Sequence, residues 1–222
     1  MSATSIDKPA GQAFFDRIPA NHNDAAEQCR TLYDEWADTY DNDLNDPSQG
    51  YMGPANAAKA IANAGGFDND QPIILDAGCG TGLSGIAVRD IGGSKVTVDG
   101  IDISTRMLDI AKTTGVYRKL DPANLSEPLE IATSAYDVVV CVGTLTGGHV
   151  GPVPALREFV RICKHGGLVV STVKESVWSS MGYKAESERL RDECQADVLS
   201  TESVPYRQGQ GVNAIMLVMR KL

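Results

Sequence analysis

The sequence predicts an α/β fold in which one mostly parallel sheet of seven strands carries helices on both faces. From residue 72 onward, short apolar runs alternate with helical patterns, as in strand–helix–strand units. A glycine-rich turn directly follows the first of these strands. The chain closes on two neighbouring strand patterns that form a hairpin-like pair, so we expect the last strand to be antiparallel. A chain of 222 residues is long enough for one large domain with its own core.

The composition excludes several other classes of protein. Twenty Lys and Arg against 29 Asp and Glu give a formal net charge of −9, and an acidic chain is a poor match for a nucleic-acid backbone. No apolar run reaches the roughly 18 residues of a membrane-spanning helix, and the first residues lack the features of a signal peptide. We expect a cytoplasmic protein that binds a small molecule, neither nucleic acid nor membrane, and forms a monomer or weak dimer.

Cysteine and histidine are too scattered to indicate a metal site. The five cysteines contain no C-x-x-C pair, so neither a disulfide framework nor a zinc site is expected. The three histidines, His22, His149 and His165, lack the spacing of metal ligands. We therefore expect free thiols and no bound metal.

The sequence divides into three stretches. Residues 1–23 are polar and without pattern, which predicts a flexible N-terminal arm. Residues 24–66 predict a helical cap or lid, and residues 67–222 predict the sheet domain, with which the cap forms one globular unit. Acidic residues cluster in the first helix and the loop after it, where we expect a solvated face; they are Asp34, Glu35, Asp38, Asp41, Asp43 and Asp46.

Local signals place the individual elements. Asp24 and Glu27 form a capping box, Ser104 is a favourable N-cap, and residues 41–53 have the composition of a loop. The predicted helices span residues 24–40, 54–64, 81–89, 104–113, 154–164 and 181–194. The predicted strands span residues 72–76, 95–102, 116–120, 136–142, 167–173, 198–206 and 212–221.

The segment ILDAGCGTG, residues 74–82, carries the most information about function. A buried strand that ends in Asp76 runs into a glycine-rich turn and then a helix. In parallel sheets, ligands bind at the carboxyl ends of the strands, and glycine lets a ligand approach the backbone. The glycines are two residues apart, whereas a dinucleotide fingerprint needs a sixth-position glycine where this chain has Leu83. A nicotinamide oxidoreductase is therefore disfavoured.

The second predicted strand ends in Asp102, twenty residues after Gly82. An acidic side chain at this strand end can accept hydrogen bonds from both ribose hydroxyls of an adenosine. Because acidic residues are common in this chain, Asp102 alone would be weak evidence for a ligand site. It becomes informative because it occurs together with the glycine turn. The two signals together indicate an adenosine-containing ligand.

With these motifs the sequence resembles the class I S-adenosylmethionine-dependent methyltransferases, which have a Rossmann-like sheet. ILDAGCGTG matches the first motif of that family, and GIDIS at residues 100–104 matches the second. YDVV at residues 136–139 resembles the fourth-strand motif. The segment over residues 156–167 resembles the helix and turn before the fifth strand, except that His165 stands where the family usually has proline. The resemblance covers about residues 31 to 221.

A closer likeness is to the methyltransferase-like proteins named for the Williams–Beuren syndrome chromosomal region. It rests on YDEWA at residues 33–37, on YD at residues 40–41, and on VGTLTGGHV at residues 142–150. The resemblance implies that S-adenosylmethionine (SAM) is the cofactor and S-adenosylhomocysteine its product. It implies no particular acceptor.

The resemblance also implies the residues that bind the cofactor. Asp76, Gly78, Cys79 and Gly80 would lie near the methionine part, and Asp102 would take the ribose. Ile103 and Met107 would flank the adenine, and Asn124 and Leu125 would meet its edge. The remaining implied contacts are Cys141 and Val142 on the sulfonium side and Trp36 and Tyr40 from the cap.

No residue identifies itself as the catalytic base, and His149, after the fourth strand, is a weak candidate. The expected function is methyl transfer from SAM to a small-molecule acceptor. One alternative is a non-catalytic SAM-binding regulatory module, which the missing base favours. Another is an aminopropyl transferase that uses decarboxylated SAM and needs an acidic site for a polyamine.

Overall fold

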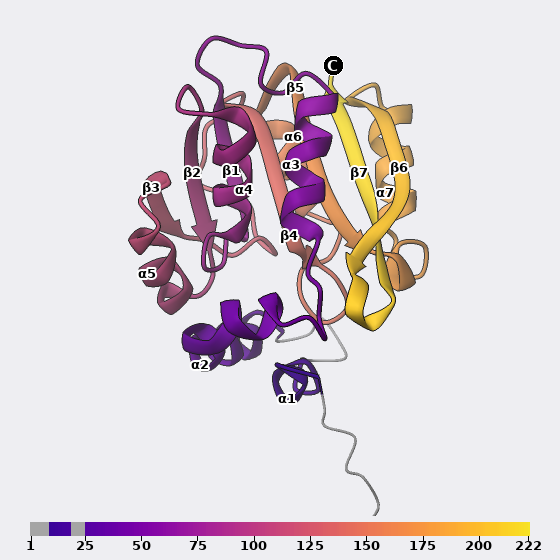
Figure 1. The fold of residues 1–222 in the computed structure, drawn as a ribbon. Helices are drawn as coiled ribbons and strands as arrows, with labels where there is room; N and C mark the ends of the chain where they lie inside the picture. Colours follow the sequence, from indigo (N-terminus) through magenta and orange to yellow (C-terminus); the bar gives the residue numbers. More distant parts are fainter. Residues whose placement is uncertain (1–8, 19–24) are drawn as a thin grey trace, which may run out of the picture.

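One sheet with helices on both faces makes up the main body in the computed structural model, which describes residues 9–18 and 25–222 (Figure 1). The helices are α1 (Gln12–Phe15), α2 (Ala25–Asn45), α3 (Gly53–Asn63), α4 (Leu83–Gly92), α5 (Thr105–Thr113), α6 (Ala155–Ile162) and α7 (Tyr183–Asp192), with short 3₁₀ turns at Glu175–Val177 and Gln208–Gln210. The strands are β1 (Ile73–Ala77), β2 (Thr97–Asp102), β3 (Tyr117–Pro122), β4 (Tyr136–Leu145), β5 (Cys163–Lys174), β6 (Ala196–Arg207) and β7 (Val212–Lys221).

The seven strands lie in the order β3-β2-β1-β4-β5-β7-β6. β1 to β5 pair in parallel, and β7 is antiparallel to both of its neighbours, β5 and β6. This confirms the predicted fold class and the antiparallel last strand. The order of strands reverses between β1 and β4, and a ligand crevice is expected beside the carboxyl ends at such a switch point.

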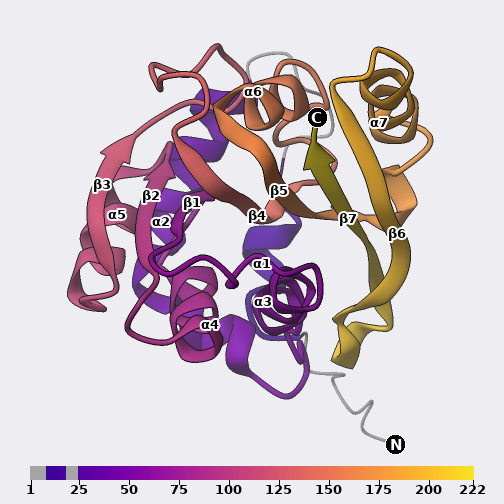
Figure 2. The ribbon, with the colours of Figure 1, turned by 90° about the horizontal axis from the view of Figure 1, so that it is seen from above.

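The central strands are buried on both faces, which explains their continuous apolar sequences. Along β4, Val138 and Val140 pack in one apolar cluster with α3 and α4, whereas Val139 and Cys141 pack in another with α6 and α7. Figure 2 shows these two helix pairs on opposite faces of the sheet. Among the described residues, no helix combines the length and the apolar character that crossing a membrane requires.

Several element boundaries differ from the sequence-based prediction. Helix α2 continues to Asn45 instead of ending at Tyr40, because the polar segment beyond Tyr40 includes Leu44, which is buried. Strand β5 begins at Cys163, which pairs with Tyr136, whereas the prediction gives residues 163 and 164 to the preceding helix. In both places the local sequence does not indicate the element, and contacts with distant residues determine where it begins or ends.

Residues 9–18, part of the predicted flexible arm, contain helix α1. Phe14 stacks on Trp36 with ring centroids 4.9 Å apart, and Phe15 meets the same indole edge-to-face at 4.9 Å. The side chain of Gln49 donates a hydrogen bond to the Ala10 carbonyl at 2.6 Å. These contacts place residues 9–18 against Trp36 and Gln49, where the sequence alone shows no pattern. The capping residue Asp24 lies outside the described residues, as do His22 and the rest of the arm.

Helix α2 crosses the carboxyl edge of the sheet, with α1 beside it (Figure 1). Asp34 accepts a hydrogen bond from the Ser104 hydroxyl at 2.6 Å, and Asp41 accepts one from the Thr81 hydroxyl. Asp43 accepts one from the Trp36 indole at 2.7 Å. These acidic residues hold the helix in place, so the expectation of a merely solvated face is wrong for them.

Candidate functional site

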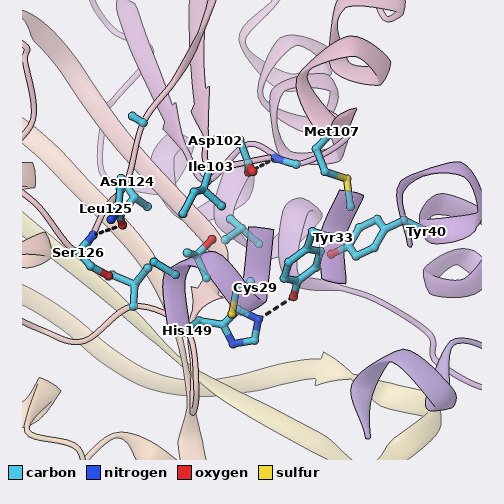
Figure 3. Close-up of a pocket in the computed structure, with 18 residues that line it drawn as sticks. Cys29, Tyr33, Tyr40, Asp102, Ile103, Met107, Asn124, Leu125, Ser126 and His149 are labelled. Carbon is cyan, nitrogen blue, oxygen red and sulfur yellow. Dashed lines mark hydrogen bonds between the residues drawn. The ribbon is translucent and has the colours of Figure 1, made fainter. Parts of the chain in front are cut away.

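A pocket opens at the carboxyl edge of the sheet between the strand ends, α2 and the start of α5 (Figure 3). Its lining is mainly apolar with a few polar groups, as in small-molecule sites. Asp102 is the one carboxylate among its lining residues, which include neither Lys nor Arg. The predicted cofactor residues that line it are Tyr40, Gly78, Gly80, Asp102, Ile103, Met107, Asn124, Leu125 and Val142, and His149 lines it as well.

The glycine turn after β1 brings backbone to the pocket surface. Gly78 has φ +76°, and a Cβ atom there would lie 2.3 Å from the Thr144 hydroxyl oxygen. Gly80 has φ +53°, and a Cβ there would have no protein atom within 4 Å. Gly78 therefore permits a close approach between β1 and β4, while Gly80 leaves open space beside the pocket.

Asp102 at the end of β2 fixes this turn to the start of α5. Its Oδ2 accepts a hydrogen bond from the Gly80 amide at 2.8 Å, and its Oδ1 accepts one from the Ser104 amide at 2.9 Å. Ser104 is the predicted N-cap of α5, since its hydroxyl accepts a hydrogen bond from the Met107 amide at 3.0 Å. Burial raises the pKa of Asp102, and these backbone bonds oppose that rise.

The wall next to Asp102 is apolar and ends in a tight turn. Ile103, Met107 and Leu125 line it, and the last two are almost fully buried. The Asn124 side-chain oxygen accepts a hydrogen bond from the Ser126 amide at 3.0 Å (Figure 3). A carbonyl oxygen has a second lone pair, so Asn124 can still accept a bond from a ligand while it holds the turn.

Three predicted contact residues lie behind the pocket wall instead of lining it. Trp36 is fully buried and packs on Tyr33 and Tyr40, which do line the pocket. Cys79 and Cys141 are buried, and burial raises the pKa of each thiol. These buried side chains support the pocket wall from behind. Because a raised pKa keeps a thiol protonated, Cys79 and Cys141 are not activated as nucleophiles.

Asp76, the fourth residue behind the wall, is a buried acid beneath the glycine turn. Its Oδ2 accepts a hydrogen bond from the Tyr117 hydroxyl at 2.7 Å, while its Oδ1 has no partner among the described residues. Burial raises the pKa of Asp76 to about 7. Folding therefore favours the protonated acid.

We expect the buried acid to make folding stability fall with rising pH. Between the ordinary pKa of 3.8 and about 7, the folded state keeps a proton that the unfolded state releases, so the free energy of unfolding declines and stays low above that range. The decline is about 4 kcal/mol, at ~1.4 kcal/mol for each pH unit between the two pKa values. Asp76→Asn should flatten the urea-unfolding profile measured from acid to mildly alkaline pH. An unchanged profile, matching that of the exposed control Asp109→Asn, would contradict this assignment.

His149 faces helix α2 from the loop after β4. Its Nδ1 lies 3.1 Å from the Gly147 carbonyl oxygen, and its Nε2 lies 2.7 Å from the Tyr33 hydroxyl. A carbonyl can only accept, so in the neutral ring Nδ1 carries the hydrogen and Nε2 accepts from Tyr33. The Cys29 thiol donates to the neighbouring Gly148 carbonyl at 3.3 Å. The structure thus presents the basic ring nitrogen on the α2 side of the pocket.

The sequence-based prediction missed pocket residues on α2. Ala26, Cys29 and Tyr33 line the pocket together with Tyr40. Their spacing of three, four and seven residues places all four on one face of a helix. Trp36, which packs toward α1, fits the same spacing, so the pattern alone does not distinguish it from the pocket residues.

Comparison with known proteins places the chain among methyltransferases. Residues 74–167 match the family model of a methyltransferase domain. Human methyltransferase-like protein 27 is 34% identical over 179 residues, which are 79% of this chain and 70% of that protein.

Solved structures share the fold at low sequence identity. A TehB-like SAM-dependent methyltransferase from Corynebacterium glutamicum has a TM-score of 0.61 at 20% identity, covering 86% of this chain and 99% of that one. The [4+2]-cyclase SpnF has a TM-score of 0.64 at 18% identity, covering 92% and 98%. At these identities the likeness shows the fold alone, and the cyclase illustrates that the fold does not by itself determine the reaction.

Proposed function

Because this chain belongs to the class I S-adenosylmethionine-dependent methyltransferases, we propose that it methylates a small-molecule acceptor held between helix α2 and the carboxyl ends of the strands. When bound, SAM supplies a methyl group on a positively charged sulfur. The observation that carries the proposal is the position of His149 Nε2 and Tyr33 Oη, 2.7 Å apart, at the pocket that the glycine turn and Asp102 line.

The pocket residues fit the cofactor. The open space at Gly80 admits a ligand to the backbone, and Asp102 keeps lone pairs for ribose hydroxyls beside the two amides that it binds. Ile103, Met107 and Leu125 offer apolar surface to the adenine. Positioning of this kind is the main protein contribution, because aligned reactants can gain roughly 7–11 kcal/mol.

We assign His149 the role of general base. The Tyr33 hydroxyl passes its proton to Nε2 and receives the proton that an acceptor hydroxyl or amine loses as its oxygen or nitrogen bonds to the methyl carbon. The bond electrons of the departing methyl group remain on the sulfur, so charge and protons balance. Helix α2 covers the pocket as a lid. Excluding water strengthens the electrostatic interactions inside the pocket.

Two measurements test the proposal together. Calorimetric titration with S-adenosylhomocysteine, NAD and decarboxylated SAM should show binding of the first in the micromolar range and the others weaker or absent. Tritium from methyl-labelled SAM should then enter the low-molecular-mass fraction of a cell extract. Binding without any transfer would favour the non-catalytic module, and no binding at millimolar ligand would reject the proposed function.

Asp102→Ala should weaken S-adenosylhomocysteine binding about ten- to a hundredfold, since a hydrogen bond to a charged group contributes roughly 1.5–3 kcal/mol. The variant removes the ribose acceptor and also the anchor of the Gly80 amide. Asp102→Asn, which keeps one acceptor oxygen, should lose less. Calorimetry measures both, with circular dichroism as the check on folding, and a wild-type dissociation constant for Asp102→Ala would place the ribose elsewhere.

A further inference from the structure

Two basic side chains stand at the carboxyl edge of the sheet, on the far side of β4 from the glycine turn. Lys174 is the last residue of β5, and Arg207 is the last residue of β6. Both strands are antiparallel to β7, which lies between them, so they end at the same edge of the sheet. That edge also carries the pocket.

Neither basic side chain pairs with an acid in the described part of the chain. Lys174 Nζ forms no hydrogen bond or ion pair there. The Arg207 guanidinium lies 4.2 Å over the Phe15 ring and donates to Gln49 Oε1 at 3.2 Å. By contrast, Arg161 and Lys164 face carboxylates at 2.7 and 2.8 Å.

Their environment makes this arrangement unfavourable without an anion. Burial, and after it the charge of Arg207, lowers the pKa of Lys174. In a chain of net charge −9, two half-buried cations near each other repel one another, and an anion between them would remove that repulsion.

Two tyrosine hydroxyls connect this pair of cations to the pocket. A Cβ atom at Gly143, which lines the pocket, would lie 3.0 Å from Tyr51 Oη and 3.3 Å from Tyr206 Oη. The two rings pack edge-to-face with centroids 5.3 Å apart. Tyr206 directly precedes Arg207, and Tyr51 forms a β-bridge with Arg207, so both tyrosines neighbour this cation along the backbone.

We propose that Lys174 and Arg207, with the hydroxyls of Tyr51 and Tyr206, bind an oxyanion of the methyl acceptor, either a carboxylate or a phosphate. The inference rests on the proposed function, because it assigns the acceptor of the same pocket a charge. A guanidinium presents several donors in one plane, an ammonium adds a point charge, and the hydroxyls complete a set of donors around an oxyanion. The acceptor is thus an anionic small molecule with a hydroxyl or amine that reaches His149.

The test titrates benzoate, phenyl phosphate and uncharged benzyl alcohol into the protein saturated with S-adenosylhomocysteine, with ligand-observed NMR as readout. At least one anion should bind about tenfold or more tightly than benzyl alcohol, and the tighter anion identifies carboxylate or phosphate. Lys174→Met should remove most of that preference, and Lys174→Arg should keep it. Lys59→Met, the same change at an exposed position of α3, is the matched control.

Several results would overturn the oxyanion site. They are equal affinity for charged and uncharged probes, an anion preference that survives Lys174→Met, or no anion binding at millimolar concentrations. A Lys174→Met protein that loses S-adenosylhomocysteine affinity instead would assign the two cations to the carboxylate of the cofactor. Failure of the proposed function is seen separately, as absent cofactor binding or absent methyl transfer in the wild-type protein.

Discussion

Gly80→Val is expected to lower the affinity for S-adenosylhomocysteine by more than about a hundredfold, or ~2.7 kcal/mol, in a protein that still folds. A Cβ at Gly80 would meet no protein atom within 4 Å, so the branched side chain does not collide with the fold. It projects instead into the space where the proposed cofactor meets the backbone. Calorimetric titration of the purified variant measures the loss.

Gly115→Val separates ligand exclusion from backbone strain. Gly115 also has a positive φ, +68°, with open space around its Cβ position, and it is exposed after the end of α5. Both variants should lose stability, because a side chain in the left-handed region costs roughly 1–2 kcal/mol. Only Gly80→Val should lose affinity. If a folded Gly80→Val protein bound like the wild type, the glycine would serve the turn alone.

His149→Ala is expected to slow methyl transfer about 10²- to 10⁴-fold, the usual contribution of a positioned general base. Its Nε2 accepts a hydrogen bond from the Tyr33 hydroxyl, so the variant removes the proposed proton acceptor. Affinity for S-adenosylhomocysteine should change only a few-fold, because the glycine turn and Asp102 remain. The readout is transfer of tritiated methyl groups from SAM to the low-molecular-mass fraction of an extract.

Tyr33→Phe is the companion variant. It keeps the aromatic contacts with Trp36 and Tyr40 but leaves Nε2 without its hydroxyl partner, so a smaller loss than that of His149→Ala is expected. Equal transfer by wild type and His149→Ala would show that the proton leaves by another route. Equal loss in both variants would show that the pair acts as one unit.

The elements that the sequence predicts correctly are those in which local chemistry and packing agree. The uninterrupted apolar run of β4 is buried on both faces of the sheet. The Ser104 hydroxyl caps α5, and the glycines at 78 and 80 adopt positive φ. Each of these features needs only a few neighbouring residues to specify it. Sequence reading therefore predicts the sheet and the glycine turn beside the pocket well.

The side of the pocket that helix α2 forms depends on partners that are distant in sequence. Trp36 and Tyr33 share the apolar pattern of one helix, yet Trp36 packs on Phe14 while Tyr33 bonds to His149. Spacing along the helix cannot tell which face meets which partner. Lys174 and Arg207 likewise look like ordinary surface cations until the sheet order brings the ends of β5 and β6 to one edge.

The bonds that hold α2 across the sheet also bear on how the protein is made. Asp34 meets Ser104 across 70 residues, and Tyr33 meets His149 across 116 residues. A ribosome therefore releases the helix long before it has synthesised either partner. Until then the side of the helix that carries Cys29 and Tyr33 lacks its native contacts with Gly148 and His149. Exposed apolar surface of this kind promotes aggregation of incomplete chains. Helix α2 thus depends on protection during biosynthesis until these distant partners have been made.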